Sequence, residues 1–243
     1  MSGPEAGGIG GAGGAAAAGG RTVLDLWEAR RVISGMGVPF DRAALASSRH
    51  EAVRAASGIG YPVAMKIVSP DIIHKTEVGG VRINLSSEKA LGDAYDAMMS
   101  SVRQKAPGAH VKGVLIEEMV RGTELIIGSS CDSQFGRMLM FGMGGVFVEI
   151  YKDVSFRLVP ISPFDAGEMI EEIKGKAILD GARGYPRADR AEIVRILLAI
   201  SDGLMRQRDI LELDINPLMV TERGLIAVDA RVILSEDART CPV

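Results

Sequence analysis

Four strand-like segments follow one another between residues 112 and 160, and they limit the fold more than any other feature of the chain. Each is a run of branched or large apolar residues between turn signals, which is typical of β-strands. They read KGVLIEEMV (112–120), TELIIGSSC (123–131), RMLMFGM (137–143) and VSFRLVP (154–160). Helical patterns precede and follow them in the chain. The sequence therefore predicts an α/β or α+β fold with mixed sheets.

The helical segments are marked by capping residues. Thr22 is a candidate N-cap for a helix that runs to about Ser34. Ser48 and Glu51 have the spacing of a capping box, for a helix that Gly58 would close. Further helices are expected to begin at Ser87, at Ser162–Pro163 and at about Asp189, the last ending near Arg206.

The first twenty residues form a Gly/Ala low-complexity segment, which predicts a flexible tail. Gly8, Gly10 and Gly13 match a G-x-G-x-x-G pattern, but no strand precedes them, so we reject a dinucleotide site there. The remaining length is enough for one large domain or two small ones. No linker divides the chain clearly, and the strand after Gly113 is the candidate hinge between two lobes.

The composition of the chain argues against several classes of partner and site. The formal net charge of −3 gives no electrostatic reason to expect nucleic-acid binding. Cys131 and Cys241 are too few for a disulfide framework, and neither lies in a C-x-x-C metal spacing. The chain has no apolar run of about 18 residues that could span a membrane, and its N-terminus lacks the pattern of a signal peptide. We therefore expect a soluble cytoplasmic protein without a membrane partner.

The C-terminal hairpin LELDINPLMVTERGLIAVDARV carries oxygen ligands. Glu212, Asp214 and Asn216 alternate with apolar residues and so share one face of a strand. With an even turn, paired residue numbers sum to 445, and Asn216 lies opposite Asp229 with Cβ atoms about 5 Å apart. A three-residue turn with a bulge would separate them. The pattern predicts a Mg²⁺ site completed by substrate phosphates, or else a solvated polar face.

A loop between two strands presents His74. The strand at 62–68 carries the single Lys66, and a second strand at 80–85 follows Gly79 and Gly80. Neutral imidazole offers a nucleophilic nitrogen at pH 7. Lys66, Lys75 and backbone N–H groups near the two glycines could neutralise a phosphoryl group there. The alternative is a loop histidine with a structural hydrogen bond.

These segments together resemble a known family. Three stretches, in this order, are similar to the beta subunits of ADP-forming acyl-CoA (acetyl-CoA) synthetases. They are YPVAMKIVSPDIIHKTEVGGVRINL, GVLIEEMVRGTELIIGSSC and LELDINPLMVTERGLIAVDARV. The resemblance runs from about residue 21 to 235. It implies an ATP-grasp fold whose two lobes hold ATP or ADP with Mg²⁺. The implied division is a tail at 1–20, an N-terminal helix and smaller lobe at 21–112, and a larger lobe with the metal-binding hairpin at 113–243.

The resemblance also implies residue roles. His74 would carry phosphate, and Lys66 would contact the α- and β-phosphates of the nucleotide. The remaining implied nucleotide-binding residues are Lys75, Thr76, Gly79, Gly80, the hinge residues Glu117, Glu118 and Val120, and the ribose-binding Glu124. Glu117 and Glu118 alternate across a strand, so at most one faces the nucleotide. The implied metal ligands are Asn216, Asp229 and Asp214, while Glu149 is either a further ligand or a surface carboxylate.

The implied reaction is acyl-CoA + ADP + phosphate ⇌ carboxylate + CoA + ATP. No segment of the chain resembles a CoA-binding domain, so the family implies a separate alpha subunit with the CoA-binding and acyl-phosphate domains, in an α2β2 assembly. Two other functions remain open: a nucleotide-sensing regulatory subunit, and a stand-alone ATP-grasp ligase that joins a carboxylate to an amine. The acyl group and the choice between ADP and GDP are also open.

Overall fold

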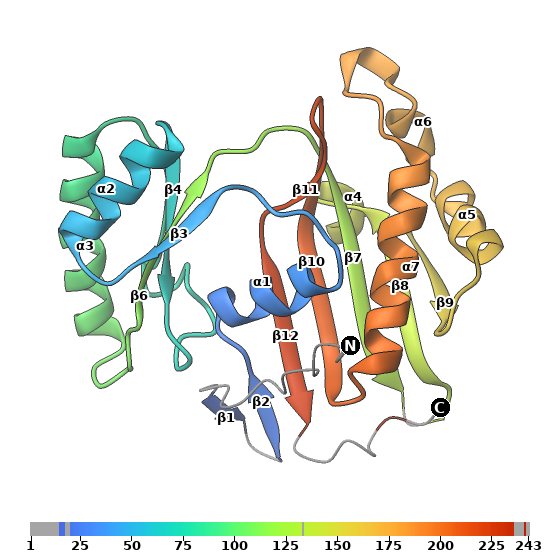
Figure 1. The fold of residues 1–243 in the computed structure, drawn as a ribbon, viewed down its shortest axis with the longest axis horizontal. Coiled ribbons are helices and arrows are strands. Elements are labelled where there is room, and N and C mark those ends of the chain that lie inside the picture. The colour runs from blue at the N-terminus through green and yellow to red at the C-terminus, as the bar shows by residue number, and fades with distance from the viewer. Residues whose placement is uncertain (1–14, 18–19, 133, 236–240, 242–243) are drawn as a thin grey trace, which may run out of the picture.

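The computed structural model describes residues 15–17, 20–132, 134–235 and 241, and it divides them between two β-sheets (Figure 1). The small sheet has the order β3 (Ala43–Ala46), β6 (Gly113–Glu118), β4 (Val63–Val68) and β5 (Val81–Leu85). The large sheet has the order β1 (Ala15–Ala17), β2 (Arg21–Val23), β12 (Ala230–Ser235), β10 (Ile210–Thr221), β7 (Thr123–Asp132), β8 (Gly136–Met143) and β9 (Val154–Leu158), with β11 (Gly224–Ala227) also paired to β10. Each sheet is the centre of one lobe.

Every ladder among the described strands is antiparallel. The prediction of mixed sheets is therefore wrong for the described strands. A parallel contact among the described residues is the single bridge between Phe40 and Ala227. The reason is local: β7, β8 and β9 follow one another through short connections, and such connections join antiparallel neighbours. The α/β fold class with two lobes agrees with the prediction.

The small lobe is a sheet covered by two helices. α2 (Arg49–Ile59) and α3 (Glu88–Lys105) lie side by side against it (Figure 1). Their apolar faces pack with alternate residues of β4 and β6 into one core, which includes Met65, Ile67 and Ile116. Burial of such side chains contributes about 1.5–3 kcal/mol each.

The large lobe buries one face of its sheet under helices. α5 (Pro163–Glu172) and α7 (Arg190–Arg206) supply most of this cover, with the short elements α4 (Val146–Glu149), α6 (Lys176–Leu179) and η1 (Ala182–Gly184) around them. α7 presents the predicted apolar positions Ile193, Leu197, Ile200 and Leu204, and all four are buried. This lobe contains the larger core.

Two elements belong to a different lobe than expected. α1 (Leu26–Gly35) buries Ala29 and Ile33 in the core of the large lobe, not the small one. β6 begins at Gly113 but lies inside the small sheet, between β3 and β4. The lobe boundary therefore follows Glu118 rather than residue 112, because the apolar face of β6 is buried by α2 and α3.

The helix caps confirm most of the predicted starts. Ser87 and Ser162 cap α3 and α5. Thr22 is not a cap: it pairs with Leu234 in the sheet, and Asp25 forms the capping box with Glu28. Ser48 caps α2, but the Glu51 carboxylate accepts hydrogen bonds from Ser47, so the predicted box is incomplete.

α2 also continues through Gly58 to Ile59, and it ends at Gly60, which has a φ of 100°. Most of the predicted 1–20 tail lies outside the described residues, but Ala15–Ala17 pairs with β2 as a strand. Cys131 and Cys241 form a disulfide, which the cysteine count did not predict. In the part of the chain described here, no helix is long and apolar enough to cross a membrane.

Candidate functional site

A cavity of about 200 Å³ lies where the His74 loop meets the large sheet. Ile73 and Lys75, the two neighbours of His74, line it from the small lobe. Asp214, Asn216 and Asp229 line it from the large lobe. The predicted phosphate loop and the predicted metal residues, about 140 positions apart in the chain, therefore border one space.

The hairpin has the predicted register. Leu218 pairs with Ala227 and Thr221 with Gly224, so paired residue numbers sum to 445 across a two-residue turn. Asn216 continues this register, and its backbone N–H donates to the Asp229 carbonyl at 3.3 Å. The alternative three-residue turn is therefore wrong, and Asn216 and Asp229 lie opposite one another.

The metal candidates offer two carboxylates and one amide. Burial raises the pKa of Asp214 to about 6; Arg231 opposes the rise and Asp229 adds to it. A cation in the cavity would relieve this penalty, because it stabilises the ionised form. Among the described residues no group of three or more His, Cys, Asp or Glu side chains could hold a metal ion. Two carboxylates and one amide are oxygen ligands of the kind that suit a Mg²⁺ ion that takes its other ligands from substrate phosphates.

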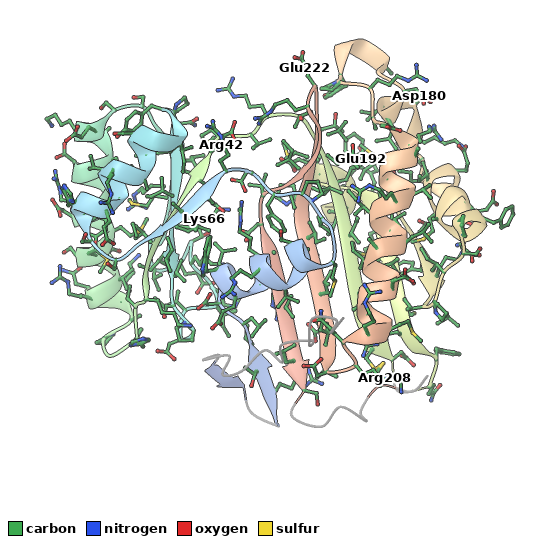
Figure 2. All side chains as sticks on the ribbon, in the orientation of Figure 1. Arg42, Lys66, Asp180, Glu192, Arg208 and Glu222 are labelled. Carbon is green, nitrogen blue, oxygen red and sulfur yellow. A yellow bond between two sulfur atoms is a disulfide. The ribbon has the colours of Figure 1, made fainter. Side chains whose placement is uncertain are left out.

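Lys66 is buried in the small sheet at the junction of the lobes (Figure 2). Its Nζ lies 2.9 Å from Glu117 Oε2 and 3.7 Å from Asp229 Oδ2, and it donates to the Val228 carbonyl at 3.2 Å. Burial opposes the charged form most strongly, but the surrounding carboxylates outweigh it and raise the pKa of Lys66. Lys66 is thus a cation held next to the predicted metal ligand Asp229.

Glu117 and Glu118 point in opposite directions, as strand alternation requires. Glu117 is buried and faces Lys66, and its pKa rises to about 7 because burial outweighs the attraction of Lys66. Glu118 binds Arg42 at 3.0 Å and Arg223 at 2.9 Å, one from each lobe. The prediction that only one of the two could face the nucleotide is consistent with this arrangement, and Glu117 is the residue directed at Lys66.

Val120 and Glu124 follow at the crossing between the lobes. Val120 lies in the short connection from β6 to β7, and Glu124 is exposed near the start of β7. The Glu124 carbonyl accepts a hydrogen bond from Gly144 at 2.7 Å, and a Cβ at Gly145 would lie 2.8 Å from Glu124 Oε2. The glycine pair thus allows backbone to approach Glu124 closely. Glu149 lies in α4, and its side chain is outside the described part of the chain.

The His74 loop is anchored at its base and exposed at its tip. His74 and Thr76 are exposed, while Lys75 is half-buried. Two contacts from α3 hold the loop: Ser101 Oγ donates to the Val78 carbonyl at 2.8 Å, and Lys105 Nζ donates to the Glu77 carbonyl at 2.9 Å. The imidazole is therefore presented to solvent by a supported loop.

The backbone N–H groups of the two glycines are used within the loop. The Gly79 N–H donates to the Thr76 carbonyl at 3.0 Å, and the Gly80 N–H donates to the Lys75 carbonyl at 2.7 Å. Neither group is directed at an incoming phosphate in this arrangement. Gly80 is required for packing instead, since a Cβ there would lie 2.4 Å from Ile67 Cγ2.

Three charged residues at the site were not identified from the sequence. Arg231 lines the cavity beside Asp214, and these two residues are paired across β10 and β12. Arg30 and Asp41 form a buried ion pair next to Glu117. Arg231 could have been found from the sequence, because it lies two positions after Asp229 and so shares its face of the strand. Arg30 could not, because its partners Asp41 and Glu117 lie outside its own helix.

Two lobes with a buried lysine on one and oxygen ligands on the other are the arrangement of ATP-grasp proteins. The family model described as ATP-grasp domain matches residues 15–234. The chain belongs to this family, and within it to the group that contains the beta subunits of ADP-forming acetate–CoA ligases.

Three relatives define that group. The chain is 44% identical over 208 residues to subunit beta of acetate–CoA ligase (ADP-forming) I from Pyrococcus furiosus, covering 85% of this chain and 90% of the relative. It is 44% identical over 211 residues to acetate–CoA ligase (ADP-forming) I from Archaeoglobus fulgidus, covering 86% of this chain but only 31% of that longer protein. The chain thus spans about a third of the single-chain relative.

The third relative has known structures. The structure of Ca. Korarchaeum cryptofilum dinucleotide forming acetyl-coenzyme A synthetase 1 with coenzyme A and Ca-AMPCP is similar with a TM-score of 0.82 and 43% identity, covering 87% of this chain and 93% of that one. A second structure of that protein, with Mg-AMPPCP, is described as having a phosphohistidine segment that points towards the nucleotide binding site; it matches with a TM-score of 0.75 and 40% identity, covering 87% and 92%.

Proposed function

We propose that this chain is the nucleotide-binding subunit of an ADP-forming acyl-CoA synthetase, and that His74 carries phosphate between a partner subunit and ADP. The overall reaction is acyl-CoA + ADP + phosphate ⇌ carboxylate + CoA + ATP. One observation carries the proposal: the residues beside His74 and the three candidate metal ligands line the same cavity. The relatives with the same domain support the choice of reaction.

The nucleotide occupies the space between the lobes. Lys66, supported by Lys75 and Thr76, binds its phosphates, and Asp229, Asn216 and Asp214 hold Mg²⁺. Glu118 and Val120 border the base, and Glu124 binds the ribose hydroxyls, while Glu117 orients Lys66. When bound, Mg²⁺ neutralises phosphate charge and orients the reacting group. Gly79 and Gly80 shape the loop rather than bind phosphate.

Phosphoryl transfer uses the free nitrogen of the His74 imidazole. In the direction of ATP cleavage, the bond between the γ-phosphorus and the bridging oxygen breaks, an N–P bond forms, and ADP leaves with the electron pair. Imidazole is an adequate nucleophile because its neutral form carries an unshared electron pair on one ring nitrogen. In the direction of ATP formation the same steps run in reverse, which suits a carrier between two sites.

The acyl chemistry takes place on a partner. The Pyrococcus furiosus relative is called a subunit beta, and the Archaeoglobus fulgidus relative is about three times as long as the matched segment. We infer that an alpha subunit with CoA-binding and acyl-phosphate domains completes the enzyme, in an α2β2 complex. We place this reaction in the cytoplasm, where ADP and CoA are available.

The test is ATP formation by the reconstituted complex. With the partner subunit present, ATP is expected only when acetyl-CoA, ADP, phosphate and Mg²⁺ are all supplied. The control is the same complex with His74→Asn, which keeps similar size but removes the nucleophilic nitrogen. ATP formation at a normal rate by the variant would contradict the carrier role. ATP-dependent joining of a carboxylate to an amine by the chain alone would favour a stand-alone ligase instead.

A further inference from the structure

Five charged residues from both lobes converge behind the nucleotide site. They are Arg30 of α1, Asp41 of the connection before β3, Lys66 of β4, Glu117 of β6 and Asp229 directly before β12. Figure 2 shows Lys66 at this junction, between the small sheet and the strands of the large sheet. Arg30, Asp41, Lys66 and Glu117 are all buried. Burying a charged side chain is costly unless it is paired with an opposite charge, so the contacts among these four residues stabilise their charged forms.

The contacts form a chain from α1 to Lys66. Arg30 pairs with Asp41, and its guanidinium carbon lies 4.6 Å from the centre of the Phe40 ring. Arg30 Nη1 also lies 3.5 Å from Glu117 Oε1, while Lys66 Nζ lies 2.9 Å from Glu117 Oε2. Glu117 is thus a single carboxylate placed between two cations.

Glu117 needs both cations. Its two carboxylate oxygens are buried, and their charged partners among the described residues are Lys66 at one oxygen and Arg30 at the other. If Lys66 alone compensated Glu117, the two charges would cancel, and a nucleotide phosphate would meet a nearly neutral pair. With Arg30 on the other oxygen, Glu117 is held between two cations, so Lys66 is not its sole partner even though Asp41 takes part of the Arg30 charge.

We propose that Arg30, fixed by Asp41, is a positioning residue for nucleotide binding: it compensates Glu117 so that Lys66 remains electrostatically available to the phosphates. Arg30 does not touch the nucleotide. Because α1 packs on the large lobe and Glu117 lies in the small one, the same contacts also fix Lys66 relative to Asp229. The inference rests on the proposed function, in which Lys66 binds phosphate.

The first experiment compares two buried arginines by titration calorimetry with Mg·ADP at pH 8, above the raised pKa of Glu117 of about 7, so that this carboxylate is ionised. Arg30→Gln is expected to weaken binding about tenfold, which corresponds to about 1.4 kcal/mol. The matched control is Arg137→Gln, because Arg137 is equally buried but donates to the carbonyls of Ile210 and Arg208, away from the site. Both substitutions are expected to lower Tm, but Arg137→Gln should leave the Kd within about twofold. Equal Kd values for Arg30→Gln and wild type would overturn the inference.

The second experiment separates charge compensation from simple packing. In a Glu117→Gln background there is no charge for Arg30 to compensate, so adding Arg30→Gln should change the Kd by less than about twofold. A tenfold loss in both backgrounds would mean that Arg30 acts only through packing. If Arg30→Gln does not fold, Asp41→Asn replaces it, because it releases Arg30 from its anchor; an unchanged Kd in that variant would then overturn the inference.

The same titrations distinguish this inference from the proposed function. No Mg·ADP binding by the wild-type chain would overturn both. Binding that is lost in Lys66→Met but kept in Arg30→Gln would leave the nucleotide site in place and overturn the role of Arg30 alone.

Discussion

Glu117 and Glu118 are neighbours on one strand, yet their ionisation affects stability in opposite directions. Burial raises the pKa of Glu117 to about 7 from an ordinary value of 4.5, with Lys66 opposing the rise. The hydrogen bond from Arg42 is the main cause that lowers the pKa of Glu118. Between about pH 4.5 and 7 the folded protein therefore holds a proton on Glu117 that the unfolded chain has released. Through this window Glu117 makes the free energy of unfolding fall as pH rises.

Glu117→Gln tests this sign, because Gln imitates the protonated form. Relative to wild type, the variant is expected to gain about 1–3 kcal/mol in free energy of unfolding between pH 5.5 and pH 8. Urea denaturation at the two pH values measures the change. Glu118→Gln is the control, and it should show no such gain, because its pKa is shifted the other way. A gain of equal size in both variants would contradict the assignment.

Asp229 is the residue on which metal-dependent nucleotide binding is expected to depend most. Asp229→Ala removes a carboxylate that lines the cavity and lies 3.7 Å from Lys66 Nζ. We expect Mg·ADP binding to weaken at least about tenfold, while binding of the partner subunit stays unchanged. Glu222→Ala, in the exposed hairpin turn, is the matched acidic control (Figure 2). An unchanged Mg·ADP affinity in calorimetry would show that the metal assignment is wrong.

At the scale of elements, the His74 loop depends on the tight packing of Gly80. An added Cβ would lie 2.4 Å from Ile67 Cγ2 and 2.9 Å from the Lys75 carbonyl oxygen. Gly80→Ala is therefore expected to lower the free energy of unfolding by about 1–3 kcal/mol. Gly58→Ala, one residue before the end of α2 and with open space around it, should instead stabilise the protein by up to about 0.5–1 kcal/mol. Thermal unfolding compares the two, and equal effects would contradict the packing argument.

The same scale shows which elements the sequence could predict. The observed hairpin register was one of the two that the sequence left open, and it could be written down in advance because strand alternation and turn length are local. The assignment of α1 and β6 to lobes could not follow from local patterns, because their apolar faces are buried by residues far away in the chain. Backbone N–H groups near Gly79 and Gly80 were predicted to meet phosphate, and the N–H groups of these two glycines themselves bond within the turn of the loop. Arg30 was missed for a related reason: a buried cation on a helix is identifiable only with its partner.

At the scale of the whole molecule, the two lobes bring the candidate nucleotide-binding residues together, and the acyl chemistry is proposed to take place on a partner subunit. The isolated chain is therefore expected to fold and to bind Mg·ADP, but not to turn over acyl-CoA. Calorimetry and an assay of CoA release, each with and without the partner subunit, measure this. Robust CoA release by the isolated chain would contradict the division of labour between two subunits.

The most direct test of the central claim is labelling of His74 from the nucleotide side. The wild-type chain is incubated with Mg²⁺ and ATP labelled at the γ-phosphate, and the protein-bound label is tested for stability in acid and base. We predict an acid-labile, base-stable label on the peptide that contains His74, and none in His74→Asn, although that variant still binds Mg·ADP. A wild-type chain that binds Mg·ATP but never labels at His74 would contradict the account.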